Sequence, residues 1–251
     1  MILANGPTGS GKTTTLYTIL KELNQPDRSI ITVEDPIEYA LAGVTQMQTN
    51  AQVGFTFASG LRSILRQDPN ILMVGEIRDE ETAGIAVNAA LTGHLVLSTL
   101  HTNDAATTFP RLIDMGVPPF LVASTVNIAM GQRLVRTLCN NCKVIRPVTD
   151  KERQGVREVL GAEGADEPLD KLWAAVGCDQ CQGTGFQGRV GIREVLPMSA
   201  GIQKLILDRS SAADIKAQAV KEGMKTMMRD GVEKASVGLT TIEEVVRLIY
   251  E

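Results

Sequence analysis

The 251-residue chain is poor in aromatic side chains and has no long apolar run. The first shortage limits which residues can form its core, and the second excludes a membrane-spanning helix. Phe, Trp and Tyr make up 4% of the residues, so a core has to be built from Leu, Ile, Val, Met and Ala. No stretch approaches the roughly 18 consecutive apolar residues of a membrane-spanning helix. The first residues, Met1 to Asn5, lack the basic segment and the apolar run of a secretory signal. We therefore expect a cytoplasmic chain.

Positive charge is scarce as well. The chain has 25 Lys and Arg against 29 Asp and Glu, a net charge of −4 at pH 7. Proteins that bind mainly the phosphate backbone of nucleic acids are usually basic. Bulk DNA or RNA binding is therefore disfavoured, although a local basic channel is compatible with this balance. The 43% of apolar residues is enough for a core in one large domain or two small ones.

The first half of the chain alternates between short apolar runs and helical patterns. Four apolar runs predict buried strands, at 1–5, 29–33, 71–74 and 95–99. Four periodic or Ala-rich stretches predict helices, at 12–23, 57–66, 80–91 and 105–115. Strands that alternate with helices favour an α/β fold with a mostly parallel sheet covered on both faces. We predict that this α/β core covers residues 1–132.

The alternation stops after Arg133, where cysteine, glycine and proline accumulate. We expect a cysteine-bearing subdomain over 133–192. From Ser199 onward the pattern is helical again, and helices are predicted at 202–207, 212–222 and 242–250. These predict a C-terminal helical subdomain over 193–251.

The segment from Gly6 to Thr13 satisfies the pattern G-x-x-x-x-G-K-[ST], between a predicted strand and a predicted helix. In such a loop, glycines let backbone N–H groups turn inward around phosphate oxygens, and the following helix directs its positive end at the anion. Lys12 is expected to reach the β- and γ-phosphates, and Thr13 to offer its hydroxyl to Mg²⁺. The alternative, a chance glycine-rich turn, requires eight residues in register by coincidence. The candidate nucleotide-binding residues of the loop are Gly6, Pro7, Thr8, Gly9, Ser10, Gly11, Lys12, Thr13 and Thr14.

Carboxylates follow two of the predicted strands. Glu34, Asp35 and Glu38 come directly after one strand, and Glu76 lies two residues after another. A P-loop enzyme needs one carboxylate to hold Mg²⁺ through water and one to activate the attacking water. Ligands of open α/β sheets bind beyond the carboxyl ends of the strands, where both groups should lie. The alternative is that these acids simply face solvent.

The chain has two histidines, His94 and His101, which bracket the apolar run from Leu95 to Leu100. A histidine is often just a hydrogen-bonded structural residue. Here both flank a strand that should neighbour the strand of the P-loop. His101 could sense the γ-phosphate or contact an adjacent subunit, and we expect at least one of the two to be functional.

The four cysteines form two C-x-x-C pairs, Cys139 with Cys142 and Cys178 with Cys181. Two such pairs supply four thiolates, which suits tetrahedral Zn²⁺ with no position left open for substrate. The metal should then be structural and contribute to folding. Disulfides or free thiols are the alternative, and disulfides are uncommon in a cytoplasmic protein. The run from Cys178 to Gly185 also fits one C-x-x-C-x-G-x-G repeat of the J-domain chaperones. Those proteins use four copies and no P-loop, so a single copy here indicates a zinc-ribbon turn and not a chaperone.

Taken together, the motifs resemble the secretion ATPase superfamily, which drives type II secretion and type IV pilus dynamics. The resemblance covers nearly the whole chain and implies that the core over residues 1–132 is a RecA-like P-loop ATPase core. It includes a Walker A segment at 6–17, an aspartate box at 34–38, an atypical Walker B segment at 75–79 and a histidine box at 92–102.

The resemblance implies a role for each motif. Lys12 and Thr13 would bind phosphate and Mg²⁺, and Glu34 and Asp35 would join the nucleotide site. Glu38 would activate water. The implied catalytic residues are Lys12, Glu38, Glu76, His94 and His101, with Glu76 supporting Mg²⁺ or its water shell and the histidines coupling the γ-phosphate to movement. The implied cofactors are ATP, Mg²⁺ and Zn²⁺.

The resemblance also implies an assembly. Members of the superfamily work as hexameric rings at the inner face of the bacterial inner membrane, where they move a platform protein that inserts or extracts pilins. The tetracysteine segment is found in pilus assembly and type II secretion motors and not in retraction motors. The sequences around Cys139 and Cys178 favour pilus assembly, with type II secretion as the alternative.

The chain begins at what looks like the end of a core strand, so we expect it to be a fragment of a longer protein. In the superfamily, an N-terminal half docks on the platform and supplies arginines to a neighbouring subunit. Such an arginine can be worth roughly 10³–10⁵ in rate. The chain alone is therefore expected to bind ATP and hydrolyse it weakly. Two alternative functions from other classes of protein remain: a RecA-like DNA translocase or helicase, and a non-catalytic zinc docking module.

Overall fold

The computed structural model describes residues 1–160 and 169–248, which divide into two compact units. Unit 1 comprises Met1–Gly131 and Val195–Met224. Unit 2 comprises Gln132–Glu194 and the segment from Lys225 onward. The chain thus passes from unit 1 to unit 2 and back, and then into unit 2 again.

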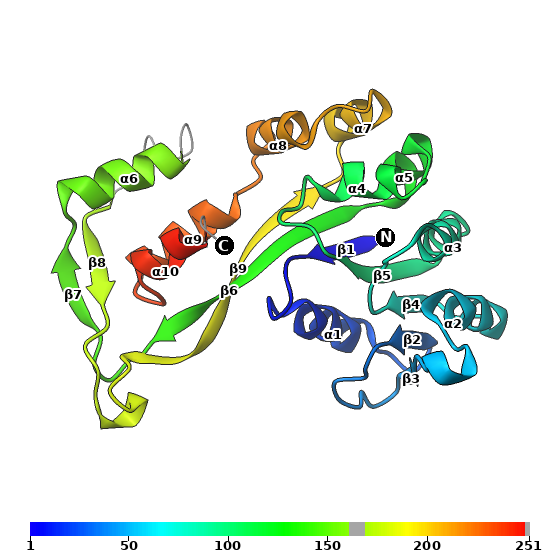
Figure 1. Cartoon of the computed structure of the whole chain (residues 1–251), viewed down its shortest axis with the longest axis horizontal. Helices are drawn as coiled ribbons and strands as arrows, with labels where there is room; N and C mark the ends of the chain where they lie inside the picture. The colour runs from blue at the N-terminus through cyan, green and yellow to red at the C-terminus, as the bar shows by residue number, and fades with distance from the viewer. Residues whose placement is uncertain (161–168, 249–251) are drawn as a thin grey trace. The chain divides into compact units, whose positions relative to one another are not determined.

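The main sheet has seven strands in the order β3-β2-β4-β5-β1-β6-β9 (Figure 1). The first six pair in parallel, with Leu3 of β1 opposite both Ser98 of β5 and Ala129 of β6. The strands are β1 (Ile2–Asn5), β2 (Ile30–Glu34), β3 (Thr45–Gln48), β4 (Ile71–Val74), β5 (Leu95–Leu100), β6 (Ile128–Leu138) and β9 (Phe186–Pro197). Strand β5 separates β1 from β4, so three strand ends that carry predicted site residues are neighbours.

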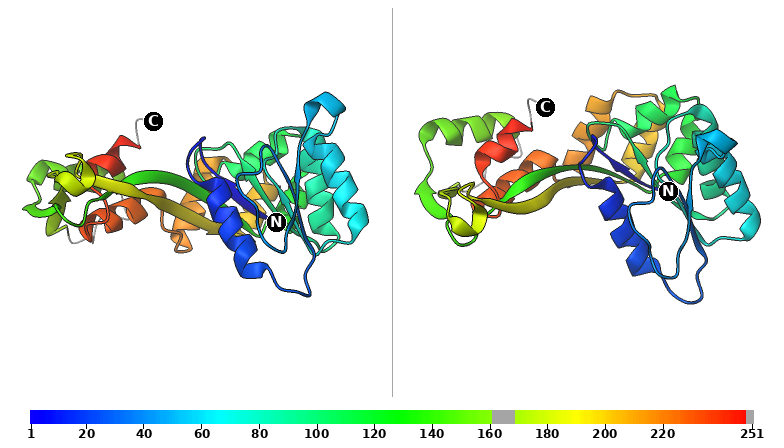
Figure 2. Two further views of the ribbon diagram at one scale, coloured as in Figure 1. Left: turned by 90° about the horizontal axis from the view of Figure 1, so that it is seen from below. Right: turned by 60° about the horizontal axis from the view of Figure 1, so that its bottom comes forward.

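Helices of unit 1 cover both faces of this sheet, with α1 on one face and α2 and α3 on the other (Figure 2). Residues of β4 alternate between two apolar clusters, since Ile71 and Met73 pack with α1 while Leu72 and Val74 pack with α2 and α3. The period of two is that of a strand buried on both faces. The helices are α1 (Lys12–Leu23), α2 (Phe57–Ile64), α3 (Glu80–Leu91), α4 (Thr108–Asp114), α5 (Pro119–Thr125), α7 (Ala200–Leu207) and α8 (Ala212–Lys221).

Local sequence explains where these helices begin. Gly11 adopts a left-handed conformation (φ 84°) at the start of α1, which suits a residue without a Cβ. The Asp79 side chain accepts a hydrogen bond from the backbone N–H of Thr82 at the start of α3, at 2.7 Å. At α2, Thr56 and Ser59 form a reciprocal capping box. Helices α1 and α3 therefore begin at the ends of the two loops that follow β1 and β4, which contain the P-loop and Glu76.

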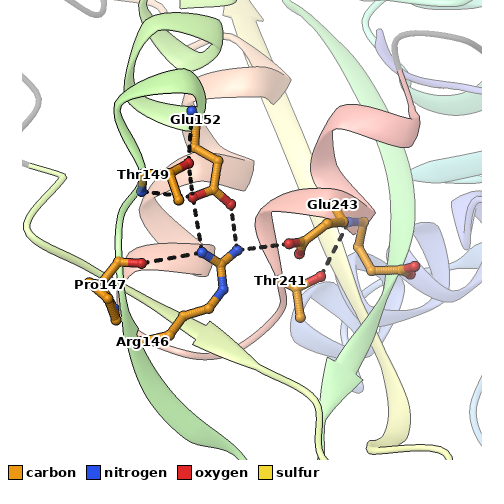
Figure 3. A network of polar contacts seen from close by, with 7 residues as sticks. Arg146, Pro147, Thr149, Glu152, Thr241 and Glu243 are labelled. Carbon is orange, nitrogen blue, oxygen red and sulfur yellow. Dashed lines mark hydrogen bonds and ion pairs between the residues drawn. The ribbon is translucent and has the colours of Figure 1, made fainter.

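Unit 2 contains the antiparallel pair of β7 (Val144–Pro147) and β8 (Lys171–Ala174), together with α6 (Asp150–Leu160), α9 (Met227–Ser236) and α10 (Ile242–Arg247). A third apolar cluster joins these elements, with Leu172 and Val245 fully buried. A polar network lies beside it. Arg146 donates to both oxygens of Glu152, at 3.0 and 2.6 Å, and to Glu243 at 2.8 Å (Figure 3).

The structure confirms all four strands and four helices predicted for the first half, with shifts of one to three residues at some ends. The helix predicted for 242–250 is present over Ile242–Arg247, and 249–251 lie outside the described residues. Sequence patterns missed β3, α5, α9 and all elements from β6 to β9. In β6 and β9 the apolar residues are interrupted by charged ones without strict alternation.

The division into units differs from the three predicted domains. The boundary after Gly131 falls one residue from the predicted end of the core at 132. The helical segment predicted for 193–251 is split, because α7 and α8 pack with unit 1 and α9 and α10 with unit 2. Whether 133–192 folds alone stays a prediction. None of the helices in the described parts of the chain has the length and apolar character needed to span a bilayer.

Candidate nucleotide-binding site

The P-loop connects the carboxyl end of β1 to α1 (Figure 1). Gly6, Gly9 and Gly11 all have positive φ angles, of 147°, 78° and 84°. Lys12 curls back over the loop, and its Nζ donates to the carbonyls of Gly6 and Pro7 at 2.8 and 3.0 Å. Burial lowers the pKa of Lys12, while the charge of Glu76 opposes this effect. A cation and the positive end of a helix therefore lie where phosphates would bind.

Glu76 lies at the centre of the polar cluster beside this loop. It follows β4, and its side chain is 13% exposed. One carboxylate oxygen pairs with the Arg78 guanidinium, and the other lies 2.9 Å from His101 Nε2. Burial raises the pKa of Glu76, but the contacts with Arg78 and His101 outweigh it and hold the pKa below its usual value. Glu76 is therefore an anion at neutral pH, as a residue that supports Mg²⁺ requires.

Glu34 and Asp35, both predicted at the nucleotide, have different surroundings. The Glu34 side chain is buried and accepts hydrogen bonds from Thr32 Oγ1 at 2.5 Å, Gln46 Nε2 at 3.1 Å and the Tyr17 hydroxyl. The structure thus directs the Glu34 side chain into the protein interior, and its predicted part in nucleotide binding stays a prediction. Asp35 is exposed at the site, with Oδ2 3.7 Å from Arg78.

Glu38 is exposed in the loop that follows β2. Burial and the neighbouring Glu34 raise the pKa of the Tyr17 phenol, and the charge of Glu38 adds to this, so Glu38 lies near that ring. Within residues 1–160, no hydrogen bond or ion pair joins Glu38 to Lys12 or Glu76. Its role in activating water stays a prediction.

The two histidines lie at opposite ends of β5. His101 follows the carboxyl end, beside Glu76. His94 precedes the first residue, and its Nδ1 contacts Ala89 O at 2.9 Å and Thr92 Oγ1 at 3.1 Å. Six strand residues at about 3.3 Å each put about 20 Å between the two ends. The structure therefore brings His101, and not His94, to the P-loop of the same chain.

In unit 2, the four cysteines converge from two turns. Their sulfurs all lie within 4.8 Å of one another, with Sγ–Sγ distances of 3.9 Å for Cys139 and Cys178 and 3.8 Å for the pairs of Cys181 with Cys142 and Cys178. Zn–S bonds of about 2.3 Å in a tetrahedron put neighbouring sulfurs about 3.8 Å apart. The spacing therefore fits a single Zn²⁺, and all four cysteines are free of disulfides.

Hydrogen bonds to the sulfurs of Cys178 and Cys181 favour the thiolate form, whereas burial raises the pKa of Cys142 to about 11. Cys181 Sγ accepts from the backbone N–H of Cys178 at 3.2 Å and of Gly185 at 3.1 Å. The Asn141 amide donates to Cys178 Sγ at 3.3 Å, and this bond is the main cause that lowers the Cys178 pKa to about 6. Thiolates are the form that binds zinc.

The fold and the site together are those of the P-loop nucleotide-binding class with a RecA-like strand order, in which one strand separates the P-loop strand from the strand that precedes Glu76. Residues 1–247 match the family described as Type II/IV secretion system protein, and the chain belongs to this family.

Named relatives agree with this placement. The type II secretion system protein E of Aeromonas hydrophila is 50% identical over 251 residues, 100% of this chain and 49% of that protein. The type IV pilus assembly ATPase PilB of Myxococcus xanthus is 49% identical over 98% of this chain and 43% of that protein. The crystal structure of the pilus retraction motor PilT with bound ADP is 30% identical with a TM-score of 0.69, over 98% of this chain and 60% of that one. The chain thus spans about half the length of the curated relatives it matches.

Two residues that contact the site acids were not singled out from the sequence. Arg78 lies in the segment 75–79 and Tyr17 in the segment 6–17, but neither was given a role. The available signal was an arginine two residues after Glu76, in the loop between β4 and α3. For Tyr17 the only signal was its position on the buried face of α1, which does not reveal the Glu34 contact.

Proposed function

We propose that this chain is the ATP-hydrolysing half of a motor that powers type IV pilus assembly, or its counterpart in type II secretion. The carrying observation is the convergence of Lys12, Glu76 and His101 at three adjacent strand ends. The two relatives with these functions are almost equally similar, at 49% and 50% identity. The residues around the cysteines are the reason to place pilus assembly first.

Roles follow from position. Lys12 and the backbone of 6–13 bind the phosphates. Thr13 would hold Mg²⁺ directly, and Glu76 would hold it through its water shell. The metal neutralises charge that develops on the phosphates. Asp35 completes this charged edge. Glu38 activates water after its loop moves toward the nucleotide, and His101 reports the state of the γ-phosphate to β5 through Glu76.

His94 takes a different part in this proposal. Because it lies about 20 Å from the P-loop of its own chain, it acts across an interface with a second subunit. Such an interface fits a homo-hexameric ring. The inner-membrane platform of the pilus or secretion machine is the proposed cargo, engaged mainly by the N-terminal half that the longer relatives carry. The proposed location is the cytoplasmic face of that membrane, and no nucleic-acid partner is expected.

Zinc at Cys139, Cys142, Cys178 and Cys181 is proposed as a structural metal. The four sulfurs leave no ligand position for a substrate. The metal would link the turn at Cys139 to the turn at Cys178, which are far apart in the sequence.

Nucleotide binding tests the proposal. Wild type is expected to bind a fluorescent ATP analogue with Mg²⁺, and Lys12→Ala to lose at least about tenfold in affinity, or about 1.4 kcal/mol. Circular dichroism should show that both proteins are folded. Equal affinities for the two proteins would contradict the proposed site. Complementation of a pilus-deficient and a secretion-deficient strain with the full-length gene then separates the two machines.

A further inference from the structure

Arg78 lies two residues beyond Glu76 and connects three segments of the site. One guanidinium nitrogen pairs with Glu76 Oε1, and another lies 3.7 Å from Asp35 Oδ2. The guanidinium carbon lies 5.8 Å from the centroid of the Phe57 ring, the first residue of α2. A planar guanidinium can serve two carboxylates and an aromatic face at once. Arg78 therefore neutralises the acids that follow β2 and β4.

The contacts of Glu76 put Arg78 where a metal ion is expected. Glu76 Oε1 pairs with Arg78 and Oε2 with His101, so both oxygens have protein partners. Hydrated Mg²⁺ at Glu76 would bring two positive charges next to the guanidinium. Like charges at contact distance repel each other strongly in a partly buried site. Arg78 and Mg²⁺ therefore compete for the same carboxylate.

The structure also shows which of the two side chains can move. The backbone around Glu76 is fixed by hydrogen bonds from Gly75 N to Val33 O at 2.8 Å and from Ile77 N to Thr99 O at 3.0 Å. The Arg78 side chain, in contrast, is 58% exposed. Ion pairs with an exposed partner contribute little to stability, so Arg78 can leave without unfolding the site.

We propose that Arg78 is the counter-cation of the nucleotide-free site, which holds Glu76 and Asp35 until Mg²⁺ arrives with the nucleotide and displaces it. The inference rests on the proposed function of Glu76. It assigns Arg78 as a positioning residue with two effects. Its charge offsets the repulsion between the empty site's acids and incoming phosphates, and it raises the Mg²⁺ concentration that tight binding requires.

The test is the Mg²⁺ dependence of nucleotide affinity, measured with a fluorescent ATP analogue in excess EDTA and in saturating Mg²⁺. The quantity of interest is the ratio of the two dissociation constants, Kd in EDTA over Kd in Mg²⁺. In Arg78→Gln, binding without metal should weaken and the Mg²⁺ requirement should fall, so the ratio should rise by about tenfold. Arg78→Lys keeps the charge and should stay within about twofold of wild type, since competition depends on charge.

Arg62→Gln is the matched control. Arg62 forms an ion pair with Glu81 at 2.6 Å between α2 and α3, with both side chains more than half exposed. The Arg62→Gln substitution removes the same charge from the same unit and leaves the contacts of Glu76 and Asp35 unchanged. Its ratio should equal that of wild type, which separates a local effect from a change in net charge.

Each outcome of this experiment either supports or overturns the role of Arg78 as counter-cation. A higher ratio in Arg78→Gln alone supports the counter-cation. An unchanged ratio in a variant that still binds nucleotide overturns this inference and leaves the proposed function intact. An equal rise in Arg62→Gln, or a Lys variant that behaves like Gln, also overturns it. A folded wild type that binds no nucleotide in either condition overturns the proposed function and this inference with it.

Discussion

Glu34 and Glu38 are four residues apart in one acidic segment, yet the structure gives them opposite surroundings. The Glu34 carboxylate is buried among hydroxyl and amide donors, whereas Glu38 is exposed in the next loop. A buried carboxylate is tolerated when its lone pairs are hydrogen-bonded. Glu34 therefore connects α1, β2 and β3 through its hydrogen bonds.

Removing one donor from this network should cost stability. In Tyr17→Phe the ring packing remains, but Glu34 loses a hydroxyl donor in the interior, so we expect a loss of about 1–3 kcal/mol in the free energy of unfolding. Urea unfolding followed by far-UV circular dichroism measures it. Tyr39→Phe is the matched control, because Tyr39 is 46% exposed and should change stability by less than about 0.5 kcal/mol. Equal losses in the two variants would contradict a buried network.

The ion pair between Arg146 and Glu152 should make the stability of unit 2 depend on pH (Figure 3). The Arg146 contact lowers the Glu152 pKa from 4.5 to about 2, against the opposing effect of burial. An acid with a lowered folded pKa stabilises the fold above pH 4.5, and this contribution disappears as the pH falls toward 2. Glu152→Gln should therefore destabilise unit 2 by about 1–3 kcal/mol at pH 7, and the difference from wild type should shrink below pH 4.5.

The fluorescence of Trp173, the single tryptophan of the chain and a residue of unit 2, can follow this unfolding. Glu158→Gln on the exposed side of α6 is the control, because Glu158 is held only by the Gln154 amide among the described contacts. A destabilisation by Glu152→Gln that stays constant from pH 7 to pH 3 would show that charge is not its cause.

At the scale of single elements, β5 separates the two histidines by its length. His101→Asn should weaken Mg²⁺-nucleotide binding by a few-fold, because it removes the imidazole beside Glu76 that is proposed to respond to the γ-phosphate. His94→Asn should leave the affinity of a single chain within about twofold, since His94 lies about 20 Å away at the other strand end. Titration with a fluorescent ATP analogue at low chain concentration compares them. An equal loss in both variants would contradict the placement of His94.

The two cysteine turns connect the proposed zinc site to the rest of unit 2. Lys143, directly after Cys142, donates to Gly238 O at 2.8 Å and lies 5.0 Å above the Trp173 ring. Gly238 has φ 75°, and a Cβ there would meet Trp173 at 2.6 Å, so only glycine lets the turn approach this closely. Movement of the cysteine turns should therefore change the surroundings of Trp173.

This arrangement predicts one zinc per chain and an optical response to its loss. Elemental analysis should find about one zinc in wild type and much less in Cys178→Ser. Treatment with a strong chelator should shift the Trp173 fluorescence of wild type and leave that of Cys178→Ser unchanged. Metal-free wild type with a full set of thiols and an unchanged spectrum would reject the zinc proposal.

Local motifs explain why some elements could be predicted and others not. The P-loop and α1 are specified by contiguous residues, and buried strands such as β4 by short apolar runs. Arg78, Tyr17 and the turn at Gly238 act through partners distant in the sequence, which no local pattern contains. The sequence places His94 before and His101 after one predicted strand, but the contact of His101 with Glu76 joins two strands and is not contained in either local pattern.

At the scale of the whole molecule, the chain corresponds to about half of its relatives. Lys12, Glu76 and Arg78 lie at the proposed phosphate-binding edge, whereas His94 lies at the opposite end of β5. If subunits complete the site, activity per chain must depend on concentration, because association follows mass action.

Steady-state ATP hydrolysis per chain, measured over a wide range of chain concentrations with Lys12→Ala as control, tests this claim most directly. We predict that the wild-type rate is low and climbs with concentration, while Lys12→Ala stays at background throughout. A wild-type rate per chain that is independent of concentration, or equal to that of Lys12→Ala, would contradict a motor whose site is completed between subunits.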